Sequence, residues 1–147
     1  MNSRAAPVIV VGFDGSPGAE AALRFAAEEA TLRGLPLRIV CAWEPRAATY
    51  VGEAFAPTAD AFLDAEHRAE ETLRSAVELA ASLGVQAEGV SIEGHPATKL
   101  IEQARDATLL VVGSRGYGTA ASLLLGSVSQ RLAHHTPCPL VIVPPKR

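Results

Sequence analysis

This chain of 147 residues contains few aromatic residues, few cysteines and fewer positive than negative side chains. Aromatic side chains make up 5% of the sequence while 48% of the residues are hydrophobic, so any core must be aliphatic. This apolar share is enough to fill a core, which excludes global disorder. Lys and Arg number 13 against 16 Asp and Glu, for a formal charge of −3. Without a basic excess, we expect no nucleic-acid partner.

The cysteines and the short apolar runs exclude further classes of protein. Cys41 and Cys138 are too few for a disulfide scaffold and form no CxxC pair for zinc, so we interpret both as buried apolar residues. The first apolar run, Val8 to Val11, is too short for a signal peptide or a membrane span. We therefore expect a cytoplasmic protein without membrane association, built as one domain over residues 1–147.

Short β-branched runs alternate with Ala-rich stretches of helical periodicity along the whole chain. Strands are predicted at 8–11, 37–43, 85–92, 108–112 and 139–143. Helices are predicted from the cap residue Ser16 to Arg33, over about 60–83, after Pro96, and up to about His134. The alternation predicts an α/β fold, with a parallel sheet covered by helices on both faces.

Residues 44–59 interrupt this alternation with Pro45, Gly52 and Pro57. The stretch is long for a connection in a compact domain, so we expect it to be functional, mobile or both. The sequence leaves open whether it closes over a ligand.

Ligands of open α/β sheets bind beyond the carboxyl ends of the strands, where the strand order reverses. Asp14 follows the first strand, and the glycine loop that begins Gly113-Ser114-Arg115-Gly116 follows the fourth. Gly113 and Gly116 would let the backbone turn tightly and approach a ligand, and Arg115 would add a charge. The Asp14 carboxylate could bind ribose hydroxyls or help to hold a metal; the alternative is a cap on the first helix together with Ser16.

A second cluster, Gly126-Ser127-Val128-Ser129, is expected to open the main part of the next helix. Unpaired N–H groups and the positive end of the helix dipole attract phosphate there. The hydroxyls of Ser127 and Ser129 would add two donors. If the first and fourth strands are neighbours, both clusters face one crevice, and a phosphate-bearing ligand is expected in it.

At this point the sequence resembles the universal stress protein family. The spacing Gly113-x2-Gly116-x9-Gly126-Ser127 is similar to the family's nucleotide signature. The stretches Val10 to Ser16, Gly94-His95-Pro96 and Thr136 to Val143 are similar to its first strand, its turn before the third helix and its last strand. The resemblance covers almost the whole chain and is weakest from Pro45 to Ala59.

The resemblance implies an open five-stranded parallel sheet in the order 3-2-1-4-5, and ATP as the ligand of members with the full signature. Carried over by position, Asp14 would face the ribose and Ala42 would meet adenine through its backbone. Gly113 and Gly116 would hold the ribose and phosphates. The phosphate chain would lie on Gly126, Ser127, Val128 and Ser129, with Mg²⁺ or Mn²⁺ bridging it. The resemblance also implies a homodimer formed through the edge strand 140–143.

Other nucleotide and catalytic motifs fit less well. There is no GxxxxGK[ST] loop and no GxSxG elbow. Residues 116–121 fit the loose dinucleotide pattern, but no acidic residue follows about 20 positions on. The four histidines have structural explanations at helix ends, a charged helix face and a turn.

Two functions from different classes therefore remain open. One is a regulatory adenine-nucleotide-binding module in a stress response. The other is a slow ATPase or phosphotransferase at the same site, which the absence of an identifiable base makes the weaker interpretation. A stress module that has lost nucleotide binding is a third possibility.

Overall fold

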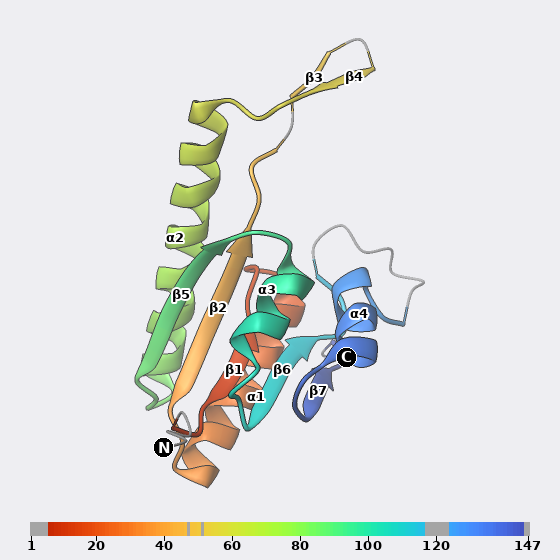
Figure 1. Cartoon of the computed structure of the whole chain (residues 1–147). Coiled ribbons are helices and arrows are strands. Elements are labelled where there is room, and N and C mark those ends of the chain that lie inside the picture. The colour runs from red at the N-terminus through yellow and green to blue at the C-terminus, as the bar shows by residue number, and fades with distance from the viewer. Residues whose placement is uncertain (1–5, 47, 51, 117–123, 146–147) are drawn as a thin grey trace, which may run out of the picture.

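A five-stranded parallel sheet forms the centre of the protein in a computed structural model that describes residues 6–46, 48–50, 52–116 and 124–145 (Figure 1). Its strands are β1 (Ile9–Gly12), β2 (Leu37–Trp43), β5 (Ala87–Glu93), β6 (Leu109–Gly113) and β7 (Leu140–Val143). They lie in the order β5-β2-β1-β6-β7. Counted along the chain, this is the predicted order 3-2-1-4-5, which is confirmed.

Four helices cover the two faces of the sheet (Figure 1). They are α1 (Pro17–Arg33), α2 (Ala59–Ser82), α3 (Pro96–Gln103) and α4 (Ser127–His135). On one face, Ile9 and Val11 pack in a cluster with residues of α1 and α2. On the other, Val10 packs with Leu100 of α3 and Leu132 of α4. Alternate residues of a strand point to opposite faces, so a strand buried on both sides reads as a continuous apolar run.

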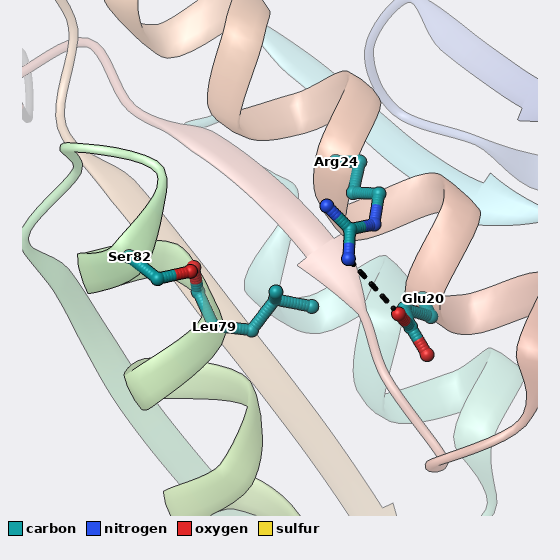
Figure 2. Close-up of polar contacts among 4 residues, drawn as sticks. All are labelled: Glu20, Arg24, Leu79 and Ser82. Atoms are coloured by element: carbon teal, nitrogen blue, oxygen red, sulfur yellow. Dashed lines mark hydrogen bonds and ion pairs between the residues drawn. The ribbon is translucent and has the colours of Figure 1, made fainter.

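The helix ends follow the cap residues of the sequence. The Ser16 hydroxyl accepts a hydrogen bond from the Ala19 N–H at 3.1 Å at the start of α1, and Gly34 ends this helix at a φ of 65°. Figure 2 shows two exposed contacts on α1 and α2: Arg24 bonds Glu20 at 3.2 Å, and the Ser82 hydroxyl donates to the Leu79 carbonyl at 2.7 Å. An exposed ion pair such as Glu20–Arg24 contributes only about 0.3–0.5 kcal/mol to stability, which is less than the burial of a core side chain contributes.

The stretch 44–59 is more ordered than its composition predicts. It contains β3 (Ala48–Tyr50) and β4 (Glu53–Phe55), which pair antiparallel, and Gly52 lies between them at a φ of 77°. This hairpin projects from the end of β2, away from the sheet (Figure 1). The sequence analysis predicted no strand in this stretch, so it missed β3 and β4.

The two edges of the sheet differ in chemistry. The edge strand β5 carries Glu88 and Glu93, both exposed, whereas β7 has the sequence LVIV and all four residues are half-buried. Among the described residues, no helix has both the length and the apolar character that crossing a membrane requires.

Leu23 and Leu32 of α1 allow a matched test of the core. The side chain of Leu23 is 0% exposed and that of Leu32 is 73% exposed. We expect Leu23→Ala to lower the free energy of unfolding by about 2–5 kcal/mol, because it leaves a cavity between α1 and the sheet. Leu32→Ala should change it by less than about 0.5 kcal/mol. Urea unfolding followed by circular dichroism measures both, and equal losses would contradict this position of α1.

Candidate functional site

A cavity of about 240 Å³ opens at the carboxyl ends of β1 and β6. Because β1 and β6 are parallel neighbours, the loops that follow them meet there. All nine residues that the sequence analysis singled out line this cavity: Asp14, Ala42, Gly113, Arg115, Gly116, Gly126, Ser127, Val128 and Ser129. The part of the wall that the structure describes includes no residue from the stretch 44–59.

Asp14 shapes the turn before α1 and also lines the cavity. Its Oδ1 atom accepts a hydrogen bond from the Ser16 N–H at 2.9 Å, while Ser16 itself caps α1. Asp14 also lines the cavity, and a Cβ added to Gly116 would lie 2.6 Å from its Oδ2 atom. One carboxylate oxygen thus shapes the turn before α1, and the other lies beside the glycine loop.

Gly113, at the end of β6, and Gly18, in α1, lie against other backbone. Among the described glycines, a positive φ occurs at Gly15, Gly34, Gly52, Gly84 and Gly94. Gly113 and Gly116 therefore need no left-handed backbone. A Cβ on Gly113 would lie 2.7 Å from the Gly18 carbonyl oxygen, and one on Gly18 would collide with the Arg115 carbonyl. These glycines let α1 and the loop after β6 approach backbone to backbone.

The start of α4 faces the cavity without a side-chain cap. Gly126 is the cap residue, and the first bond within the helix runs from the Gln130 N–H to the Gly126 carbonyl. The N–H groups of Ser127, Val128 and Ser129 therefore have no acceptor within the helix. They lie at the positive end of the helix dipole, as a phosphate site requires.

Two of the expected phosphate donors are used inside the protein. The Gly126 N–H donates to the Ser114 carbonyl at 2.7 Å. The buried Ser129 hydroxyl lies 2.8 Å from the same oxygen and 3.0 Å from the Gly126 carbonyl. A hydroxyl has one hydrogen to give, so Ser129 does not offer the donor that the sequence analysis assigned to it. Ser127 is exposed and retains its place at the mouth of the site.

An apolar group of residues also lines the cavity. The sequence analysis missed it, although Val40, Leu100 and Val112 line the cavity together with Pro96 and Phe13. Val40 and Val112 lie in β2 and β6, so their position was implied by the expected strands. Leu100 lies in α3, the helix that the sequence predicted after Pro96. The site thus combines an apolar side with a polar side, as a small-molecule pocket does.

Charged and metal-binding groups are few at this site. Asp14 and Arg115 are the charged residues among the described lining. Across the parts of the chain that the structure describes, no three His, Cys, Asp or Glu side chains gather into a preformed metal site. Burial, with a smaller effect from Asp14, raises the pKa of the Cys41 thiol to about 11, so this thiol stays neutral at physiological pH.

Comparison with known proteins agrees with the resemblance seen in the sequence. A family model described as the universal stress protein family matches residues 7–144. Over 140 residues the chain is 36% identical to a universal stress protein of Mycobacterium tuberculosis strain H37Rv, which covers 92% of this chain and 46% of the relative. The chain therefore spans about half the length of several curated relatives that it matches.

Solved structures are similar over nearly the full chain. A universal stress protein in complex with cAMP superposes with a TM-score of 0.73 at 30% identity, covering 97% of this chain and 99% of that one. A universal stress protein from Archaeoglobus fulgidus in complex with dAMP superposes with a TM-score of 0.68 at 26% identity, covering 95% and 98%.

The contact between Gly113 and α1 predicts a difference between two glycine substitutions. A new Cβ at Gly113 meets the fixed backbone of Gly18 at 2.7 Å, whereas at Gly12 it meets the movable Leu100 side chain at 2.8 Å. We expect Gly113→Ala to lower the free energy of unfolding by about 1–3 kcal/mol, and Gly12→Ala by less. Parallel thermal and urea unfolding measures both. A neutral Gly113→Ala would contradict the close approach of β6 to α1.

Proposed function

The chain belongs to the universal stress protein family, and we propose that it is a regulatory protein of a stress response that binds an adenine nucleotide, with ATP as the expected ligand. The nucleotide would lie at the carboxyl ends of β1 and β6, where the strand order reverses. The observation that carries this proposal is the start of α4, which has no side-chain cap and lines one cavity together with apolar residues.

The two sides of the cavity match the two ends of a nucleotide. The N–H groups of Ser127 and Val128 would donate to phosphate oxygens at the helix start. The apolar residues Val40 and Leu100 would pack against the base, with the Ala42 backbone giving hydrogen bonds to its edge. Two of the similar solved structures are in complex with cAMP and with dAMP, and each of these ligands has one adenine and one phosphate.

Asp14 and the loop glycines would hold the middle of the nucleotide. The Asp14 carboxylate can accept hydrogen bonds from ribose hydroxyls, and it lies next to Gly116. Gly113 and Gly116 leave space for the ribose and phosphates because neither adds a side chain to the wall. Arg115 lies in the same loop and lines the cavity, where it would add a positive charge near the phosphate chain.

A divalent metal fits this site only together with the phosphates. Mg²⁺ is often held by one or two carboxylates plus substrate phosphates, and Asp14 is the carboxylate that the described lining offers. Mg²⁺ or Mn²⁺ would neutralise charge on an ATP phosphate chain there. A nucleoside monophosphate needs no such ion, because the α4 N–H groups suffice for one phosphate.

Gly126→Asp tests the phosphate assignment. Aspartate is a favoured cap residue, so its carboxylate should accept hydrogen bonds from the α4 N–H groups and repel the phosphate from them. We expect about 100-fold or more loss of affinity for AMP, cAMP and ATP by calorimetry, with equal or higher thermal stability. Gly126→Asn is the matched control, because asparagine has the same size and also caps the helix but has no charge; its smaller loss of affinity measures the effect of the occupied N–H groups alone. Wild-type affinity in Gly126→Asp would disprove the assignment.

Phosphate release distinguishes binding from turnover. Among the described residues that line the cavity there is no histidine, and Asp14 is the one carboxylate. We therefore propose a nucleotide-binding protein rather than an efficient enzyme. Multiple turnovers of ATP with Mg²⁺ or Mn²⁺ that are lost in Asp14→Ala would support a slow ATPase at the same site. A wild-type protein that gives no heat with any adenine nucleotide would instead disprove nucleotide binding.

We also propose that two copies pair through the β7 edge. Its four residues are apolar and only half-buried, whereas the opposite edge is charged, and an exposed apolar edge favours pairing. The carbonyls of Pro139 and Val143 accept hydrogen bonds from Leu110 and Ser114, so the odd-numbered residues of β7 face β6. The backbone groups of Leu140 and Ile142 therefore face outward.

Ile142→Pro tests this pairing without removing a bond between β7 and β6. Proline lacks the outward N–H that a second copy would use, and edge strands tolerate proline. We expect a dimer of wild-type protein by light scattering and a monomer of the variant, with unchanged helical circular dichroism. A monomeric wild-type protein at micromolar concentration would exclude the dimer.

A further inference from the structure

The position of α4 depends on more than its connection to the sheet. β6 ends at Gly113 and α4 begins at Ser127, so a long connection separates them. The two ends of this connection are in contact. The carbonyl oxygen of Ser114, at the first end, lies 2.7 Å from the Gly126 nitrogen and 2.8 Å from the Ser129 hydroxyl, at the other. These two contacts fasten the first turn of α4 to the residue that follows β6.

Ser114 is itself a fixed point. Its N–H donates to the Val143 carbonyl at 2.9 Å, which ties it to the end of β7. Ser114 and Ser129 are 5% and 3% exposed, so water does not compete for these hydrogen bonds. The start of α4 is therefore held at a defined distance from two strands of the sheet.

We propose that Ser129 is a positioning residue for the phosphate site, acting through Ser114 rather than on the nucleotide. This inference rests on the proposed nucleotide binding. The Ser129 hydroxyl gives its hydrogen to a backbone carbonyl, so it has none for a phosphate, and its lone pairs would repel a phosphate oxygen. Its proposed role is to fix the position of the Ser127 and Val128 N–H groups.

Hydrogen exchange in the nucleotide-free protein separates this role from direct contact. We expect Ser129→Ala to raise the exchange rate of the Gly126 amide several-fold by NMR, because the contact that holds Gly126 beside Ser114 is weakened. Ser127→Ala makes the same change at an exposed position of the same turn and should leave that rate at its wild-type value. A direct phosphate ligand would not alter exchange when no nucleotide is present.

Nucleotide affinity completes the test. Ser129→Ala should weaken cAMP and AMP binding about fivefold to tenfold by calorimetry, the change expected for one buried hydrogen bond. Ser129→Thr keeps the hydroxyl and should restore both the exchange rate and the affinity; Ser129→Cys, which is closer in size, serves if threonine disturbs the packing.

Three results would overturn the proposal. They are unchanged Gly126 exchange in Ser129→Ala, raised exchange without loss of affinity, or no rescue by either conservative variant. Failure of the wild-type protein to bind any nucleotide would disprove the proposed function instead. In that case the exchange data would still decide whether Ser129 fixes the start of α4.

Discussion

The parallel pairing of β1 with β6 is the constraint on which the site depends. Ile9 aligns with Leu109 and Val11 with Val111, so two segments about a hundred residues apart end at the same edge of the sheet. Helices that follow parallel strands begin at that edge, and residues at or beside the starts of α1, α3 and α4 all line the cavity. Their positive dipole ends converge on one place, in a protein whose formal charge is −3.

Small residues make this convergence possible. α1 buries six residues against the sheet, and five of them are alanine. At its start, Gly18 and Gly113 let the backbone of α1 meet the loop after β6, at a separation that a single Cβ would prevent. The scarcity of aromatic side chains is consistent with this packing, since large rings would hold the helices further from the sheet. The composition and the cavity thus have a common physical cause.

The sequence was sufficient to predict the bounds of those helices and strands whose local signals agree with their burial. Strand β2 was predicted with its observed bounds, and so were the cap residue Ser16 and the last residue Arg33 of α1, because β-branched runs and cap residues act locally. The hairpin was missed because Ala48–Tyr50 and Glu53–Phe55 have three residues each, too few to show a period.

The sequence predicted which residues line the cavity, but it did not predict which of their atoms remain available to a ligand. Strand order brings Asp14, Gly116 and Ser127 to one cavity, and the spacing of the motif indicated this set. Which atoms remain available depends on tertiary contacts that no local pattern encodes. Ser129 differs from Ser127 because its hydroxyl lies beside the Ser114 carbonyl, and Gly126 loses its N–H to the same oxygen.

The helix starts fall into two kinds, because α1 and α2 have side-chain caps and α3 and α4 have none. The starts of α1 and α2 are capped by the side chains of Ser16 and Thr58, which satisfy one N–H each. α4 begins at Ser127 after the cap residue Gly126, which has no side chain, although a capping side chain there would typically stabilise the helix by about 1 kcal/mol. A cap would also occupy the N–H groups that the proposed phosphate needs. The missing cap is therefore consistent with a helix start kept open for an anion, at a cost in stability that a bound phosphate would offset.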